Sequence, residues 1–480
     1  MKKLAIALLP LLMVVSCSKN LSDININPKL PQNVPAATLF SNAQKNFTDL
    51  LTSSNVNTNI FRLIVQYWTE TTYTDESNFD LNTRQIPRQI WNGLYRDVIS
   101  NLRAAKTVIP GESQSSNATE NAAIIKNRQA QAEIMEIIAW YYLVTTYGDI
   151  PYTEALDVEN PQPKYDNQKT IYTDLLTRMD AAIANLNTTY DGFGSADLLY
   201  GGDATEWKKF ANSFKLKMGM TIADADPAKA KSVVESAVAS GVFTSAEDNA
   251  QFNYLSAPPN TNPIWVDLVQ SGRKDFVVTR TIVDQMLSLN DPRVNDYFTL
   301  NGAGTDYSGG TAGASNNYAT FSKPSARIIN PEAPALIMSY YEVEFFLAEA
   351  AQRGFTVPGT AAQHYRNAIT ASILWWGGTN TEANAYLTQP SVAYNAANWR
   401  QSIGVQKWIA LYNRGWEEWI EWRRLDYPQL VKPSGALSVI PLRFTYPVPE
   451  QNVNTANYKA AVTAMGGQDV VATKLFWDVQ

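Results

Sequence analysis

The chain of 480 residues has very few of the side chains that carry metal and nucleophile chemistry. It contains one cysteine, Cys17, and one histidine, His364. A single cysteine excludes an internal disulfide, so the fold has to be stabilised by its own core. A single histidine excludes histidine-rich metal clusters, and a Ser/His/Asp or Cys/His catalytic site would have to use His364. His364 falls inside a predicted helix, where a hydrogen-bonded structural histidine is the simpler interpretation.

The chain also lacks an excess of basic residues. Lys and Arg number 39 against 45 Asp and Glu, which gives a formal net charge of −6. Nucleic-acid binding depends on basic patches, so we expect no nucleic-acid partner. After Cys17 no apolar run approaches the roughly 20 residues that a membrane-spanning helix needs. We therefore expect a soluble body that is attached to a membrane only through its N-terminus.

The N-terminal residues have the features of a bacterial lipoprotein signal. Lys2 and Lys3 precede an apolar stretch, residues 4–15, which is too short to remain as a transmembrane helix. Ser16-Cys17 follows, and a small residue directly before a cysteine at this point resembles a lipobox. The alternative is that Cys17 is an incidental residue of an ordinary secretory signal. We favour lipidation of Cys17, because two or three acyl chains are enough for stable membrane anchoring.

The apolar periodicity predicts a mostly α-helical body. We expect a signal peptide at 1–16, a lipidated tether at 17–35 and a body at 36–480, with an irregular insertion at about 249–330 and few short strands. Apolar residues three and four apart predict helices at 129–147, 169–186, 206–223, 227–241, 334–353, 360–375 and 402–426. The Pro-punctuated tail at 428–449 contains short apolar runs that are compatible with strands.

One segment has the spacing of a tetratricopeptide repeat. Trp140, Leu143 and Tyr147 match the first helix of such a repeat, and residues 152–156 match the start of its second helix. Because Gly148 and Pro151 interrupt the pattern, we expect degenerate repeats in a globular protein rather than an open solenoid.

Short motifs in a constant order extend over nearly the whole chain and identify a resemblance to a known family. The chain resembles the SusD/RagB nutrient-binding outer-membrane lipoproteins, in the SusD-like subgroup. The motifs are Asn27-Pro28, Trp91-Asn92-Gly93-Leu94-Tyr95, Tyr147-Gly148-Asp149-Ile150-Pro151, Tyr200-Gly201-Gly202-Asp203, Asp291-Pro292-Arg293 and Glu421-Trp422-Arg423-Arg424.

The resemblance implies a scaffold of four tetratricopeptide-like helix pairs with a loop-rich ligand-binding part. It also implies a partner, a SusC-like TonB-dependent β-barrel transporter, and a location on the outer membrane, at the cell surface. The implied function is to capture an oligosaccharide or a peptide and deliver it to that transporter. The stretch after Cys17 is poor in acidic residues, whereas surface-export signals in the family tend to be acidic there.

Aromatic residues are abundant, with 13 Trp and 24 Tyr. Sugar rings bind with their C–H faces on aromatic planes while polar neighbours bind the hydroxyl groups. Aromatic residues in polar, irregular segments are therefore candidates for ligand contact, and the alternative for each is to anchor a loop. The candidates are Tyr73, Tyr254, Trp265, Tyr307 and Tyr318. The resemblance adds Trp91 and Asn101, which share a helical segment with apolar residues and for which a structural role is the alternative. We assign Trp140, Trp207, Trp375, Trp408 and Trp419 to packing.

No motif indicates catalysis or a cofactor other than the covalent lipid on Cys17. Oxygen-rich turns at Asp248-Asn249 and Asp296 are compatible with a structural calcium ion, but their spacing identifies no specific metal site. We therefore predict a binding protein and not an enzyme. One alternative is a lipid-anchored glycoside hydrolase, which needs only two acids.

The acids Glu417 and Glu421 are spaced for such a pair, but they are equally explained by ion pairs with Arg414, Arg423 or Arg424. The second alternative is a protein-interaction scaffold, because tetratricopeptide-like pairs commonly bind protein.

Overall fold

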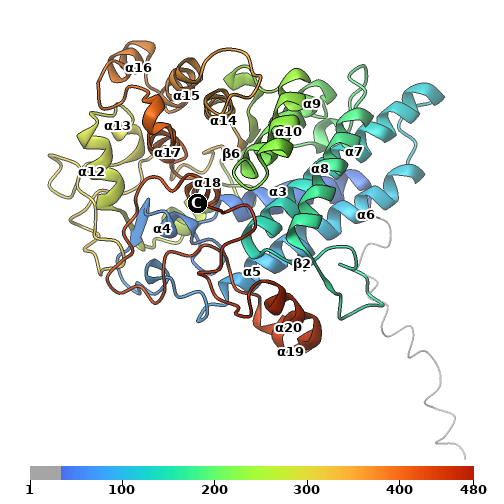
Figure 1. Cartoon of the computed structure of the whole chain (residues 1–480), viewed down its shortest axis with the longest axis horizontal. Coiled ribbons are helices and arrows are strands. Elements are labelled where there is room, and N and C mark those ends of the chain that lie inside the picture. The colour runs from blue at the N-terminus through green and yellow to red at the C-terminus, as the bar shows by residue number, and fades with distance from the viewer. Residues whose placement is uncertain (1–33) are drawn as a thin grey trace, which may run out of the picture. The chain divides into compact units, whose positions relative to one another are not determined.

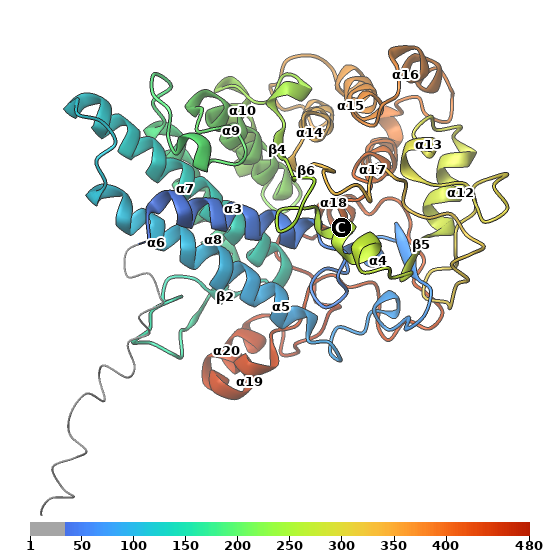
Figure 2. The ribbon, with the colours of Figure 1, turned by 180° about the vertical axis from the view of Figure 1, so that it is seen from behind.

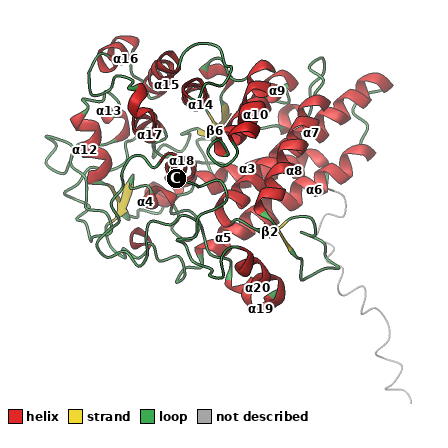
Figure 3. Cartoon of the chain, viewed as in Figure 1, coloured by secondary structure: helices red, strands yellow, loops and turns green. Residues whose placement is uncertain are grey.

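Helical hairpins form most of the protein (Figures 1 and 3). The computed structural model describes residues 34–480, and residues 36–480 form one unit. The hairpins are α7 (Ala118–Tyr147) with α8 (Gln168–Asn185), α9 (Ala204–Thr221) with α10 (Pro227–Ala239), α14 (Tyr340–Gln352) with α15 (Ala361–Trp375), and α17 (Trp399–Ala410) with α18 (Gly415–Leu425). The prediction of a mostly helical fold is confirmed.

A second group of helices begins the described chain. Helix α3 (Ala36–Thr52) packs against α6 (Ser100–Val108) and against the π-helical segment η2 (Gly93–Ile99), which continues α5 (Ile86–Asn92). Figure 2 shows α3 alongside α6. The shorter helices are α4 (Phe61–Ile64), α11 (Pro263–Trp265), the π-helical η6 (Val266–Gln270), α12 (Arg280–Ser288), α13 (Val294–Tyr297), α16 (Asn380–Leu387), α19 (Val448–Val453) and α20 (Thr455–Ala464).

The strands are short and pair across long separations in sequence. The antiparallel pairs are β1 (Trp68–Glu70) with β5 (Phe276–Val278), β2 (Ile150–Pro151) with β3 (Tyr165–Asp166), and β4 (Ala250–Phe252) with β6 (Ala335–Met338). Single 3-10 turns occur at η1 (Glu76–Asn78), η3 (Ile109–Gly111), η4 (Gly194–Ala196), η5 (Ala246–Asp248) and η7 (Ala396–Asn398). Figure 3 shows that the loops concentrate around α4 and α12, on the side that carries the β1–β5 pair.

Several helices begin at the capping residues that the sequence indicates. The side chain of Asp226 accepts a hydrogen bond from the backbone N–H of Lys229, and Pro227 is the first residue of α10, as predicted. Asp203 caps α9 in the same way, and Asn117 caps α7. Local polar side chains therefore define these helix starts.

The prediction of a second helix at 152–156 is wrong. This segment is a turn, and α8 begins only at Gln168. The backbone N–H groups of Tyr152 and Thr153 bind the carboxylate of Asp166 on β3, and Leu156 has a left-handed φ of 64°. Contacts with β3 therefore replace the helical hydrogen bonds that the repeat spacing suggested.

Three further segments also differ from the predictions. The predicted helix at 334–353 begins with strand β6, because β4 supplies a partner strand from a distant part of the sequence. The predicted helix at 402–426 is two helices, since Asn413 adopts a left-handed φ of 73° and interrupts the chain between α17 and α18. Residues 428–447 contain no strand.

A network of buried charges connects the hairpins. Glu421 on α18 binds Arg424 at 2.7 Å and Lys407 on α17 at 2.9 Å, and Arg424 binds Glu349 on α14 at 2.6 Å. All four side chains are buried. The predicted pairing of Glu421 with Arg424 is confirmed. Glu417, in contrast, pairs with Lys217 on α9 and not with the predicted arginines, because tertiary packing brings α9 against α18.

Two neighbouring acids on α18 differ in charge state. Burial alone would raise the pKa of Glu421, but Arg424 and Lys407 lower it to about 2. Glu418 is equally buried, and within residues 34–480 neither of its carboxyl oxygens has a hydrogen-bond partner. Burial and the charge of Glu421 raise the pKa of Glu418 well above its usual value. The surroundings therefore favour the ionised form of Glu421 and the protonated form of Glu418.

This difference predicts opposite sensitivities to the same substitution. We expect Glu421→Gln to lower the free energy of unfolding by about 3–5 kcal/mol, because it leaves two buried cations without their shared acid. We expect Glu418→Gln to change it by less than about 1 kcal/mol, because a neutral group replaces a neutral group. Denaturant unfolding at pH 7, followed by circular dichroism, measures both. Equal losses in the two variants would contradict the assignment of charge.

Candidate functional site

Three segments that are distant in sequence meet at one end of the β1–β5 sheet. The backbone N–H of Thr71 donates to Asp275 O at 2.9 Å, and its hydroxyl donates to Lys274 O at 2.7 Å. The carbonyl oxygen of Thr71 accepts from the backbone N–H of Asn316 at 3.0 Å and from the Ser315 hydroxyl at 2.9 Å. Thr71 therefore connects the end of β1 to the start of β5 and to the loop that contains Ser315 and Asn316.

These segments place two tyrosines and two lysines around the end of the sheet. Tyr73 is 80% exposed and has a left-handed φ of 53°. Tyr318 is half-buried, with Lys323 Nζ at 5.0 Å and Lys274 Nζ at 5.8 Å from the centre of its ring. We call these four residues the sheet-end surface. It offers aromatic faces for stacking and ammonium groups that donate hydrogen bonds.

Two acids support the turn that carries Tyr73. Glu70 is buried and accepts a hydrogen bond from the backbone N–H of Ser77 at 2.8 Å, while Glu76 pairs with Arg84. Burial and the adjacent Glu76 together raise the pKa of Glu70 to about 8, although the hydrogen bond from Ser77 opposes this shift. Glu70 is therefore protonated at neutral pH and can donate a hydrogen bond to Glu76.

The raised pKa of Glu70 predicts a pH dependence of stability. The folded chain retains this proton up to about pH 8, whereas the unfolded chain releases it near pH 4.5. The contribution of Glu70 to stability is thus complete below pH 4.5 and is lost as the pH rises to about 8. Because glutamine has no proton to lose, we expect Glu70→Gln to become more stable relative to the native protein between pH 5 and 8, as measured by thermal unfolding.

The exposed Glu332 provides the control for this experiment. The difference between Glu332→Gln and the native protein should not vary over the same pH range. A difference for Glu70→Gln that is constant with pH would contradict the protonated state of Glu70.

The other predicted aromatic residues lie at different places. Tyr307 is half-buried, and its hydroxyl donates to Asn295 at 2.5 Å. Trp265 is half-buried at the end of α11. Tyr254 is buried, contacts Phe252 and donates to Asp49 at 2.9 Å. Tyr254 thus anchors a loop, which was the alternative role for these residues.

The two residues suggested by the resemblance have local partners. Trp91 is buried between Tyr95 and Tyr147, whose ring centres lie at 4.8 and 5.1 Å. Asn101 is half-buried, and its side-chain amide donates to the carbonyl of Asp97, one turn earlier in the same helical segment. In this structure the ring of Trp91 is part of the core, and neither residue belongs to the sheet-end surface.

His364 has a structural environment. Its Nδ1 lies 2.7 Å from Glu344 on α14, and its Nε2 contacts the carbonyl of Pro358. Burial lowers its pKa, but the hydrogen bonds with Glu344 and Pro358 and the charge of Glu344 together outweigh burial, and the net pKa is raised. His364 therefore connects the two helices of the α14–α15 hairpin.

The oxygen-rich turns considered for calcium have other contacts. The Asp248 carboxylate accepts hydrogen bonds from Thr244 and Ser245 and binds Lys209 at 2.7 Å. Asp296, in the other turn, is half-buried, and this burial raises the pKa of its carboxyl group. Among the described residues, no cluster of three or more His, Cys, Asp or Glu side chains is arranged to hold a metal ion.

Comparison with known proteins agrees with the fold and decides the family. Residues 28–447 match a SusD-like family model described as "Starch-binding associating with outer membrane". The chain belongs to the SusD-like family. The predicted resemblance is confirmed, and family membership identifies a binding protein rather than an enzyme. No curated protein matches the chain significantly.

Solved structures extend this SusD-like assignment over nearly the full body. A chitin-binding protein is 26% identical, with a TM-score of 0.79, and the match covers 93% of this chain and 100% of that chain. A SusD homolog from Bacteroides uniformis is 28% identical, with a TM-score of 0.79 and coverage of 92% and 99%. A chitin-binding SusD homolog from Flavobacterium johnsoniae is 24% identical, with a TM-score of 0.77 and coverage of 92% and 98%, and supports the fold alone.

Sequence reasoning missed some residues of interest in this SusD-like protein. Lys274 and Lys323 were not candidates, because nothing in the local pattern connects them to Tyr318. Trp375 was assigned to packing but is half-buried. The adjacent Trp376 is buried against Tyr297 and Tyr412. Consecutive side chains on a helix point about 100° apart. The adjacent Trp375 and Trp376 at the end of α15 therefore indicated that only one of the two rings faces the core.

Proposed function

We propose that this protein captures an oligosaccharide at the sheet-end surface and delivers it to a SusC-like TonB-dependent outer-membrane transporter. The observation that carries the proposal is the exposed ring of Tyr73, on the segment that Thr71 joins to the segments carrying Lys274 and Tyr318. Tyr318 in turn lies near Lys274 and Lys323. An exposed aromatic ring stacks on the C–H face of a sugar, and lysine ammonium groups donate to hydroxyl oxygens. An open surface also suits a chain of sugars that extends beyond the contact.

Chitin oligosaccharides are the first ligands to test. The support is the 26% identical structure described as a chitin-binding protein, together with the starch-binding description of the family. Peptides remain the alternative ligand. An acid pair for glycoside hydrolysis finds no support at Glu417 and Glu421, because both are buried within the ion-pair network.

The proposed location is the outer-membrane surface, with the body held by lipid on Cys17. Cys17 and residues 1–33 lie outside the described residues, so the support is the lipobox-like sequence and the outer-membrane association of the family. Among residues 34–480, no helix is both long enough and apolar enough to span a bilayer. The transporter partner is proposed from family membership.

Removal of either tyrosine ring should weaken glycan binding. A stacked ring that buries roughly 60 Å² of apolar surface contributes about 1.5 kcal/mol, so we expect Tyr73→Ala and Tyr318→Ala each to raise the Kd for the bound oligosaccharide about tenfold. Isothermal titration with chitin, starch and peptide oligomers measures this change. Tyr190→Ala, at a half-buried tyrosine outside the surface, is the matched control and should bind normally. Equal affinities in all three variants would exclude the sheet-end surface as the binding site.

The anchor has a separate test. We expect Cys17→Ser to move the folded protein from the membrane fraction to the soluble fraction of cells, because the hydroxyl group cannot carry the thioether-linked lipid. Ser18→Ala is the control and should remain with the membrane. A Cys17→Ser protein that stays in the membrane fraction would refute lipid anchoring at this residue.

A further inference from the structure

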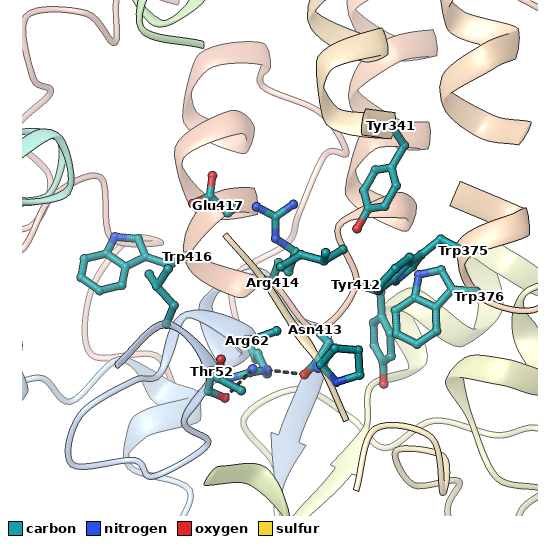
Figure 4. Close-up of a pocket in the computed structure, with 14 residues that line it drawn as sticks. Thr52, Arg62, Tyr341, Trp375, Trp376, Tyr412, Asn413, Arg414, Trp416 and Glu417 are labelled. Carbon is teal, nitrogen blue, oxygen red and sulfur yellow. Dashed lines mark hydrogen bonds between the residues drawn. The ribbon is translucent and has the colours of Figure 1, made fainter. Parts of the chain in front are cut away.

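A small pocket opens where β6, the end of α3 and the break between α17 and α18 meet (Figure 4). Its volume is about 70 Å³. Its lining includes the buried side chains of Arg62 and Tyr341, together with exposed Pro334 and half-buried Trp375 and Asn413, which give it access to solvent. We call this cavity the Arg62 pocket. It is separate from the four residues of the sheet-end surface.

Arg62 is a buried cation whose contacts are all neutral. It is 3% exposed. Its Nε donates to Asn413 Oδ1 at 2.8 Å, and its two terminal nitrogens donate to the carbonyl oxygens of Ser53 at 2.7 Å and Thr52 at 2.8 Å. Its guanidinium carbon lies 5.1 Å from the ring centre of Trp68. Three of its five N–H groups are thus used, and two remain for another acceptor.

No acid of the pocket lining pairs with Arg62, and the negative charge that acts on it comes from Asp267, outside the lining. Burial lowers the pKa of Arg62 only to about 10, so the side chain stays charged at neutral pH. Arg414, also in the lining, is matched by Glu342 at 2.8 Å. Among the residues that line the pocket, all of which belong to the described chain, Glu417 is the single acid. It pairs with Lys217. The lining of the pocket therefore carries a net positive charge, which a bound anion would offset.

We propose that the Arg62 pocket binds the carboxylate of an acidic sugar. A cavity of about 150 Å³ is needed to hold a benzene ring, so about 70 Å³ holds a carboxylate group but not a pyranose ring. The ring of the sugar then lies at the mouth, against the half-buried indole of Trp375. The carboxylate supplies the anion that Arg62 lacks, through the two N–H groups that remain.

The lining favours a sugar acid over an amino acid. An amino acid or peptide terminus carries an ammonium or amide group, and an ammonium group needs a nearby acid. Within the pocket the acid Glu417 is already paired, and Arg62 and Arg414 repel a second cation. The flat indole of Trp375 instead matches the C–H face of a pyranose ring.

Glucuronate and glucose are the matched probes, because they differ by the carboxylate alone. In isothermal titration of the full chain we expect glucuronate to bind and glucose not to bind. We expect Arg62→Met, which keeps the length of the side chain, to weaken glucuronate binding about 30-fold, because charge-assisted hydrogen bonds are among the strong ones. Trp375→Ala should weaken binding about tenfold, and because this ring is half-buried the variant tests the pocket even if Arg62→Met fails to fold.

Three outcomes would overturn the proposal. They are no binding of glucuronate to the native protein, equal binding of glucuronate and glucose, or unchanged binding in a folded Arg62→Met variant. Binding of aspartate with the same affinity as glucuronate would also refute the preference for a sugar acid. Tyr73→Ala separates this proposal from capture at the sheet-end surface, since it should lose neutral oligosaccharide while glucuronate still binds.

Discussion

The pairing of buried charges is the constraint on which the helical scaffold depends. Glu421 and Arg424 on α18 reach Lys407 on α17 and Glu349 on α14, and Lys217 on α9 reaches back to α18. Each of these charges would be costly in an apolar core without its partner. These charges therefore favour the arrangement of α9, α14, α17 and α18 that brings them together.

Both proposed sites lie where an irregular segment meets the scaffold, but they suit different chemistry. Thr71 holds strand and loop segments side by side and leaves the ring of Tyr73 open to solvent. Asn413 interrupts the helical chain and accepts a hydrogen bond from Arg62, a buried cation that lines a small cavity. The open surface suits extended neutral chains, and the small pocket suits one small anion.

The differences between predicted and observed elements have a common cause. The start of α10 was predictable because Asp226 and Pro227 act within one helical turn. The turn at 152–156 depends on Asp166, and the break at Asn413 coincides with a contact to Arg62, which lies 351 residues away. The aromatic candidates behave in the same way. Tyr73 and Tyr254 both lie in irregular polar segments, and contacts with Asp49 and Phe252 accompany the burial of Tyr254, whereas Tyr73 is exposed.

The sequence alone determined the helical class, most helix positions, the lipoprotein-like N-terminus and the family. Periodicity, capping and short motifs involve only a few neighbouring residues, so the sequence alone is enough to predict them. Only the tertiary structure decided which charges pair, that Lys274 and Lys323 flank Tyr318, and that Arg62 borders a pocket whose single acid is already paired. Burial and electrostatic pairing depend on segments that are brought together from distant parts of the chain, and no local pattern records those contacts.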